Sequence, residues 1–139
     1  MGVVVDASLL AAIALTEPQS ETVSEALQRW SDSGDELHAP ALLPFEVGSA
    51  LTKAVSRGEI ATEDAGEAWL GLQHLPITFH DMHAEVPEMI ETASALRRRS
   101  AYHAAYLVLA KRLGAEFFTL DGSLYRNPAE LGHAVNLIE

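Results

Sequence analysis

The first residues of the chain constrain its fold more than any other stretch. Three valines, residues 3–5, are followed directly by Asp6. A run of β-branched residues is typical of a short strand that is buried on both faces, as in a parallel sheet. Because a carboxylate is depleted in strands and costly to bury without a partner, we expect Asp6 at the strand's carboxyl end. Ligands of open α/β sheets bind at that edge.

Asp6 in that position also fits a simple turn or cap residue, so its role depends on what else reaches the same edge. Ser8 is expected to cap a helix over residues 9–15. A candidate site therefore needs further polar residues that the fold brings to the end of this first strand.

Strand and helix patterns alternate along the chain. Strands are predicted at residues 3–5, 36–39, 76–79, 115–120 and 134–138. Helices are predicted at residues 9–15, 19–32, 41–57, from a cap at Thr62 through Leu72, 84–99 and 100–113. This alternation predicts an α/β fold in which helices cover both faces of a parallel sheet. The length of 139 residues fits one domain, residues 1–139.

Composition excludes several classes of protein. The chain has no cysteine, which rules out disulfides, thiolate metal sites and a cysteine nucleophile. It has no apolar run of membrane-spanning length and no basic segment ahead of the first strand, so we expect no membrane span, no signal peptide and a cytoplasmic location. The net charge of −11 argues against nonspecific nucleic-acid binding over a broad basic surface, while it permits a metal site or a basic partner.

Three further residues are polar where the local pattern favours apolar side chains. Asp121 follows the fourth predicted strand as Asp6 follows the first, although an Asp-Gly turn explains it equally well. Glu46 lies near the start of a predicted helix, where a carboxylate also favours the helix dipole. His103 becomes the third residue of its helix if Ser100 is the N-cap, and a histidine hydrogen-bonded at a helix start is the simpler interpretation.

Taken together, these motifs resemble those of a known family. They are the initial Val-Val-Asp-Ala-Ser, Glu46 ahead of a helix of small residues, the Tyr-x-Ala-Ala-Tyr-Leu-x-Leu-Ala helix and the Thr-Leu-Asp that ends at Asp121. In this order and at these intervals they resemble a PIN domain, and more closely the VapC-type ribonuclease toxins of toxin–antitoxin pairs. The resemblance implies a three-layer α/β fold with a five-stranded parallel sheet in the order 3-2-1-4-5.

The resemblance also implies a function. It implies a metal-dependent endoribonuclease, the toxin of a type II toxin–antitoxin pair, that cleaves RNA phosphodiester bonds with Mg²⁺ or Mn²⁺. The implied partners are a cognate VapB-type antitoxin, an RNA substrate and a second copy in a homodimer. The family's acidic catalytic residues fall on Asp6, Glu46 and Asp121. A further aspartate of the family falls on the position of His103.

The chemistry of a metal site explains why acids would gather. Clustered carboxylates repel one another and raise each other's pKa values unless a divalent cation is bound among them. Mg²⁺ prefers oxygen ligands, activates a bound water and neutralises charge on a phosphate. Asp6 and Asp121 are the expected direct ligands, with Glu46 as a ligand or a residue that holds water. Ser8 is expected to support Asp6 through a hydrogen bond.

His103 leaves several interpretations open. An imidazole suits Mn²⁺ or Zn²⁺ better than Mg²⁺, so the histidine would change the metal preference or weaken binding. It would alternatively carry protons near neutral pH. A third interpretation is a catalytically weakened PIN domain that acts by binding RNA or protein.

The basic run Arg97, Arg98 and Arg99 has two interpretations. These residues would contact RNA phosphates beside the site, or they would form a solvated helix end. The sequence His80-Asp81-x-His83 follows a strand in a polar turn, and we expect an exposed loop there rather than a second metal site.

Overall fold

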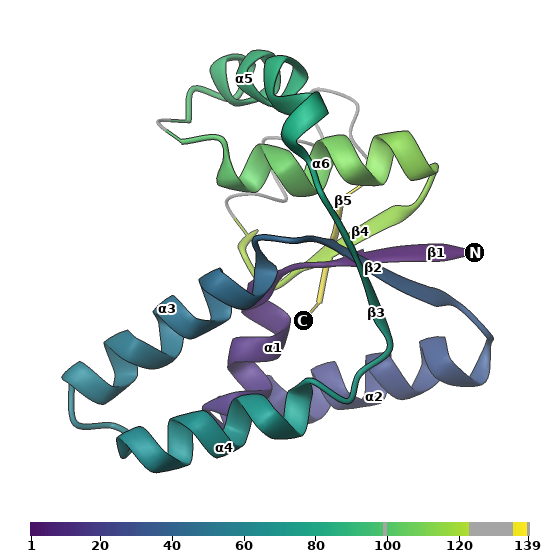
Figure 1. The fold of residues 1–139 in the computed structure, drawn as a ribbon. Helices are drawn as coiled ribbons and strands as arrows, with labels where there is room; N and C mark the ends of the chain where they lie inside the picture. The colour runs from purple at the N-terminus through teal and green to yellow at the C-terminus, as the bar shows by residue number, and fades with distance from the viewer. Residues whose placement is uncertain (99, 123–134, 139) are drawn as a thin grey trace.

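A parallel five-stranded sheet forms the centre of the computed structural model, which describes residues 1–98, 100–122 and 135–138 (Figure 1). The strands are β1 (Gly2–Val5), β2 (Glu36–Pro40), β3 (Ile77–His80), β4 (Glu116–Thr119) and β5 (Val135–Leu137). Their order in the sheet is β3-β2-β1-β4-β5, and each neighbouring pair is parallel. The predicted fold class and strand order are therefore confirmed.

Helices cover both faces of this sheet, so the fold has three layers with the sheet in the middle. The helices are α1 (Ala7–Ala14), α2 (Ser20–Asp32), α3 (Leu43–Ser56), α4 (Thr62–Leu72), the short 3₁₀ helix η1 (His83–Glu85), α5 (Val86–Ala95) and α6 (Tyr102–Leu113). Figure 1 shows α5 and α6 on one side of the sheet and α1 to α4 on the other. Among the described residues, no helix has both the length and the apolar character needed to cross a bilayer.

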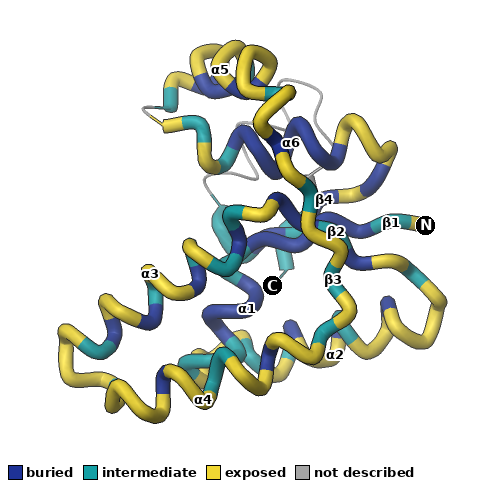
Figure 2. Tube along the Cα trace, viewed as in Figure 1, coloured by how far each residue is buried: buried dark blue, intermediate teal, exposed yellow. Residues whose placement is uncertain are grey.

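The core lies along β1 and α6. Val3, Val4 and Val5 are almost completely buried, as expected for a strand with helices on both sides. The whole stretch 104–110 of α6 is also buried, and Figure 2 shows this as the dark section of the helix. A helix that is apolar on all sides belongs in a protein interior. Asp6 of the candidate site directly follows β1, and His103 and Tyr106 lie on α6 itself.

The start of α1 differs from the prediction. Asp6, and not Ser8, is the N-cap, because its side chain accepts a hydrogen bond from the backbone N–H of Ser8. The helix consequently begins at Ala7, immediately after the strand. Aspartate caps a helix as well as serine does, and the residue that stands first after the strand takes the position.

The segment before and at the start of α6 also differs. The predicted helix 84–99 is divided into η1 and α5, and α5 ends at Ala95. Arg97 then has a positive φ of 56°, which a continuing helix does not allow. Ala101, and not Ser100, is the N-cap of α6, so His103 is the second helical residue.

Candidate active site

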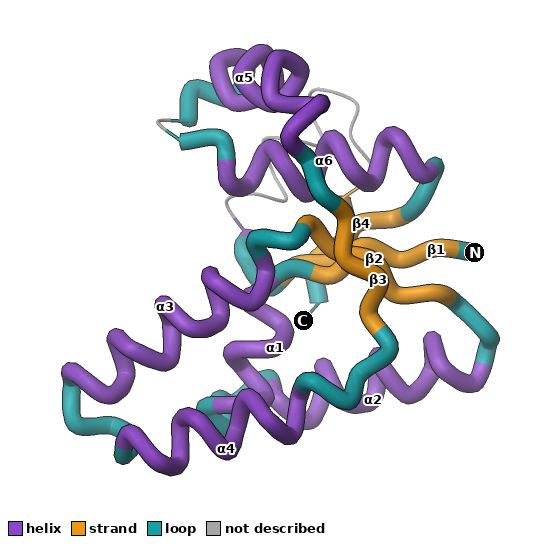
Figure 3. The backbone as a smooth tube through the Cα atoms, in the orientation of Figure 1, coloured by secondary structure: helices purple, strands orange, loops and turns teal. Residues whose placement is uncertain are grey.

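The candidate site lies at the carboxyl edge of the sheet. Figure 3 shows the starts of α1, α3 and α6 gathered on the left of the strands. Asp6 lies at the end of β1 and is only 5% exposed. Its Oδ1 accepts hydrogen bonds from the backbone N–H of Ser8, at 3.0 Å, and from the Ser8 hydroxyl. Its Oδ2 accepts a 2.6 Å hydrogen bond from the Thr119 hydroxyl. The carboxylate is thus held in one orientation by donors on both oxygens.

Burial raises the pKa of Asp6 to about 6. The hydrogen bonds from Ser8 and Thr119 act in the opposite direction, as does the nearby His103, but they do not outweigh the loss of solvation. Asp6 is therefore a buried negative charge that its neighbours compensate only in part. A cation placed beside it would lower its free energy.

Two hydroxyl groups join the end of β1 to the end of β4. The strands pair in parallel, with Val5 opposite Phe118. The Ser8 hydroxyl oxygen accepts a 3.1 Å hydrogen bond from the backbone N–H of Leu120. The Thr119 hydroxyl oxygen accepts a 3.0 Å hydrogen bond from the backbone N–H of Asp121. These bonds bring the segment that carries Asp121 to the strand end that carries Asp6.

Thr119 was not among the residues selected from the sequence. It is a completely buried polar side chain, and it lies two positions before Asp121. A threonine in a strand is ordinary because of its β-branched shape, so the residue type gave no signal. Its alternation within β4 places it on a buried face, where its hydroxyl needs a partner.

Glu46 lies in the first turn of α3, and Tyr106 of α6 holds its side chain. The phenol hydroxyl donates a 2.5 Å hydrogen bond to Oε1 of Glu46. Burial, then the charge of Glu46 and this hydrogen bond, raise the pKa of Tyr106 far above its ordinary value, and the charge of Asp6 adds to the effect. The phenol is therefore a permanent hydrogen-bond donor that faces both carboxylates.

Tyr106 is likewise not among the site residues predicted from the sequence, although it belongs to the Tyr-x-Ala-Ala-Tyr-Leu-x-Leu-Ala motif. The sequence does contain a signal. Within the buried stretch 104–110 of α6, Tyr106 is the one side chain that ends in a polar group. A buried tyrosine hydroxyl normally requires a partner, and the partner here is a carboxylate on another helix.

His103 lies one turn before Tyr106 on α6 and is half-buried. Its charge lowers the pKa of Asp6, which places the imidazole on the side of the site that Asp6 occupies. Within residues 1–98, 100–122 and 135–138, however, no three acidic or histidine side chains are close enough together to hold an ion. The structure thus brings the candidate residues to one edge without forming a closed cluster of ligands.

The basic run precedes α6. Nε and Nη2 of Arg98 are buried and have no hydrogen-bond partner in the described part of the chain. Buried guanidinium nitrogens without a partner are costly, so this end of α5 is held at some cost in stability. Arg99 lies outside the described residues.

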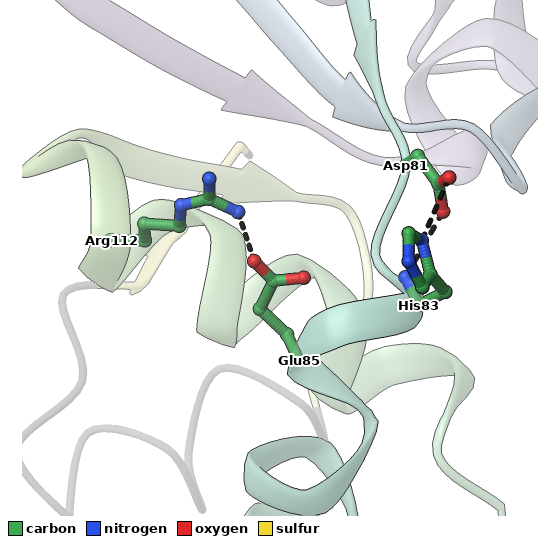
Figure 4. Close-up of polar contacts among 4 residues, drawn as sticks. All are labelled: Asp81, His83, Glu85 and Arg112. Carbon is green, nitrogen blue, oxygen red and sulfur yellow. Dashed lines mark hydrogen bonds and ion pairs between the residues drawn. The ribbon is translucent and has the colours of Figure 1, made fainter.

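The residues of His80-Asp81-x-His83 do not form a common site. The ring of His83 pairs with Asp81 at 2.9 Å, and both side chains are exposed, as the polar turn predicted (Figure 4). His80 instead pairs with His38 of the neighbouring strand, with 2.9 Å between Nε2 and Nδ1. Figure 4 also shows Glu85 of η1 reaching Arg112 of α6.

The chain is similar to known proteins over most of its length. The family model of the PIN domain matches residues 3–130. Ribonuclease VapC3 of Pyrobaculum aerophilum is 31% identical over 131 residues, which are 89% of this chain and 92% of that protein. Ribonuclease VapC12 of Mycobacterium tuberculosis is 30% identical over 125 residues, 88% of each chain. Ribonuclease VapC1 of Mycobacterium tuberculosis is 37% identical over 92 residues, 66% of this chain and 67% of that protein.

A solved structure has the same fold. The crystal structure of PAE2754 from Pyrobaculum aerophilum matches with a TM-score of 0.63 at 21% sequence identity. The match covers 91% of this chain and 87% of that one. At this level of identity the similarity concerns the fold.

Proposed function

Because this chain belongs to the PIN-domain family and is a VapC-type ribonuclease, we propose that it cleaves RNA phosphodiester bonds with Mg²⁺ or Mn²⁺, as the toxin of a type II toxin–antitoxin pair. The observation that carries the proposal is Asp6. Its buried carboxylate is oriented by Ser8 and Thr119, has a raised pKa and lies at the carboxyl edge of a parallel sheet. An oriented buried carboxylate that lacks a full counter-charge is typical of a functional site.

The donor chemistry of this edge fits a hard divalent cation. We assign Asp6 and Asp121 as its ligands, and Glu46 as a ligand or as a residue that holds a coordinated water. All three offer carboxylate oxygens, which Mg²⁺ and Mn²⁺ prefer. A bound ion of this kind lowers the pKa of a water and neutralises charge on the phosphate. The carboxylates are not yet gathered into a cluster, so ion binding would draw them together.

The chain's own residues have separate tasks in this proposal. Ser8 and Thr119 fix the direction of the Asp6 carboxylate, which limits the positions that an ion or water can occupy beside it. Tyr106 fixes Glu46 in the same way from the opposite side of the edge. Arg97, Arg98 and Arg99, the basic run ahead of α6, would contact RNA phosphates.

His103 supports a second candidate function. It stands where the family has an acidic residue, and its charge lowers the pKa of Asp6, although by less than the hydrogen bonds from Ser8 and Thr119 do. In this alternative the domain has weak catalysis and acts by binding RNA or protein. If His103 is instead a ligand, Mn²⁺ should support activity better than Mg²⁺.

The proposed partners follow from the family and from charge. We propose a VapB-type antitoxin whose basic segment is attracted to the acidic edge of a chain with a net charge of −11. A homodimer in the cytoplasm completes the proposal. The pairing is tested by co-expressing this chain with the product of a short neighbouring reading frame that encodes a basic segment, followed by co-purification.

The test of the function is RNA cleavage by the purified full chain. Structured RNAs are incubated with Mn²⁺, with Mg²⁺ or with a chelator, beside the variants Asp6→Asn and His103→Asp. The proposal expects metal-dependent cleavage by the wild type and none by Asp6→Asn. Cleavage by His103→Asp alone would favour the binding alternative. No cleavage by any of them at high protein excess would contradict the proposed activity.

A further inference from the structure

Two exposed aromatic rings lie beside the candidate site, and neither has a role in the catalytic proposal. Phe45 is 80% exposed although it is a large apolar side chain, and Tyr102 is 62% exposed. Phe45 directly precedes Glu46 on α3, and Tyr102 directly precedes His103 on α6. Two residues from separate helices thus present aromatic rings to solvent at the same edge of the sheet.

These rings border a pocket of about 530 Å³. Its lining includes Phe45, Tyr102, Glu46 and Lys53. Lys53 lies two turns after Glu46 on α3 and gives the pocket a positive charge within an acidic chain. The pocket therefore combines aromatic faces, one cation and direct contact with an acid of the proposed site.

Phe45 also borders a second hollow of about 300 Å³. Its lining includes Phe45, Met82, His83 and Val86, which come from α3 and from the segment around η1. Figure 4 shows His83 at the start of η1, held there by Asp81. Leu42 and Phe45 line both hollows, and Phe45 is the aromatic ring at their shared border.

We propose that Phe45 is a wedge between two consecutive bases of a single-stranded RNA, with Tyr102 stacking on the base in the larger pocket and Lys53 contacting the phosphate. The inference rests on the proposed ribonuclease function and adds how its substrate is held. Single-stranded RNA is recognised mainly through unstacked bases that stack on aromatic side chains. A paired duplex keeps its bases stacked inside and cannot receive the wedge.

RNA fits this surface better than a protein helix does. A helix that presents only an apolar stripe would leave Lys53 unpaired in the pocket, whereas a nucleotide supplies a flat ring for Tyr102 and a phosphate for Lys53. The position next to Glu46 places the stacked nucleotide beside the bond to be cut. The wedge would thereby fix which phosphodiester reaches Asp6, as substrate positioning requires.

Binding is measured without cleavage to separate this inference from the catalytic proposal. The full-length Asp6→Asn protein, in chelator, is titrated into a fluorescently labelled short single-stranded oligoribonucleotide and into its paired duplex, with anisotropy as the readout. Phe45→Ala or Tyr102→Ala in this background should weaken single-strand binding by about tenfold or more, as loss of base stacking does. Leu70→Ala, which removes another exposed apolar side chain on α4, is the matched control and should bind as the parent does.

Lys53→Gln should weaken binding and reduce its salt dependence, while Lys111→Gln, on α6 and paired with Glu88, should not. Equal affinity of the parent and Phe45→Ala for the single strand would overturn the inference, even if the wild type cleaves RNA. A change in the oligomeric state of Phe45→Ala with unchanged RNA affinity would also overturn it and assign the surface to a protein contact. Stacking-dependent binding by a wild type that never cleaves would contradict only the catalytic proposal.

Discussion

The hydroxyl of Tyr106 lies 2.5 Å from Oε1 of Glu46, although the two residues are 60 positions apart in the chain. This bond joins α6 on one face of the sheet to α3 on the other. It passes beside Asp6, whose charge acts on the same phenol. The site is therefore held together by side-chain bonds between the layers as well as by the strands.

Removing the Tyr106 hydroxyl should weaken the site more than the fold. Tyr106→Phe removes the hydrogen-bond partner of the half-buried Glu46, whose carboxylate can still be reached by water, so stability should change by about 1 kcal/mol. Metal affinity or activity should fall roughly 10- to 100-fold, as when other residues that hold metal ligands are removed. Calorimetric Mn²⁺ titration and urea unfolding measure the two effects. Tyr102→Phe removes an exposed hydroxyl and is the control for metal affinity. A large loss of stability with unchanged metal binding would contradict this role.

Replacing Asp6 should stabilise the protein at neutral pH. The pKa of Asp6 is raised from 3.8 to about 6, so its favourable contribution is complete below pH 3.8 and is lost as pH rises through 6. The ionised form then costs about 3 kcal/mol at pH 7, which is an upper bound for the gain in Asp6→Asn. Urea unfolding of both proteins between pH 4 and pH 8 should show a difference that grows with pH. A difference that is independent of pH would show that the charge is not the cause.

Saturating Mn²⁺ should remove most of the difference between the two proteins at pH 7. The ion offsets the charge of Asp6 in the wild type and has less to bind in the variant. The melting temperature of each protein, with and without the ion, measures the effect. A rise in melting temperature that is equal for wild type and Asp6→Asn would place the ion elsewhere.

The pair His38 and His80 should make the sheet sensitive to mild acid. Partial burial, then His38 and Arg112, lowers the pKa of His80 below its ordinary value of 6.5. The stability that depends on neutral His80 is fully present above pH 6.5 and is lost as pH falls below it. His80→Gln keeps a polar partner for His38 and should lose less stability between pH 7 and pH 5 than the wild type does.

The titration of Asp6 raises stability as pH falls through the same range, which is opposite to the effect of His80. The pH profile of the variant must therefore be compared with that of the wild type. The control is His83→Gln, because that histidine is exposed and pairs with Asp81. Parallel pH profiles for wild type and His80→Gln would rule out the histidine pair as the source of acid sensitivity.

Arg97 is a position where glycine should stabilise the fold. Its φ of 56° is in the left-handed region, which glycine adopts without the penalty of a Cβ atom. The backbone N–H of Arg98 donates to the carbonyl of Ala93, as in the usual glycine-containing helix end. The free energy of unfolding of Arg97→Gly, measured in urea, should exceed that of Arg97→Ala by about 0.5–1 kcal/mol. Both variants lose the same charge, so the difference reports the backbone conformation. Equal stability of the two variants would contradict the expected backbone strain.

The fold could be predicted from the sequence because its signals are local. Three patterns show this: the valine run of β1, the apolar face of α3 and the buried stretch of α6. Each consists of residues that are close together in the chain. The strand order came from the family resemblance. Helix ends were less accurate because competing caps lie close together, as at Asp6 with Ser8 and at Ser100 with Ala101.

The partners of the site residues could not be predicted in the same way. Thr119 reaches Asp6 over 113 positions, and Tyr106 reaches Glu46 over 60. Such contacts depend on the register of β1 with β4 and on how two helices pack, which a single sequence does not specify. The acidic residues were recognised because a carboxylate is unusual beside apolar runs, whereas threonine and tyrosine are ordinary in those positions.

The bond from Thr119 to Asp6 also has a consequence for the time at which the protein becomes active. A ribosome releases β1 before β4, and a chain grows by roughly 5–20 residues per second. Asp6 receives its second hydroxyl partner only after the 113 positions that separate it from Thr119 have been synthesised. Until then only Ser8 orients the carboxylate, so a nuclease built in this way completes its site after the strand that carries Asp6 has left the ribosome.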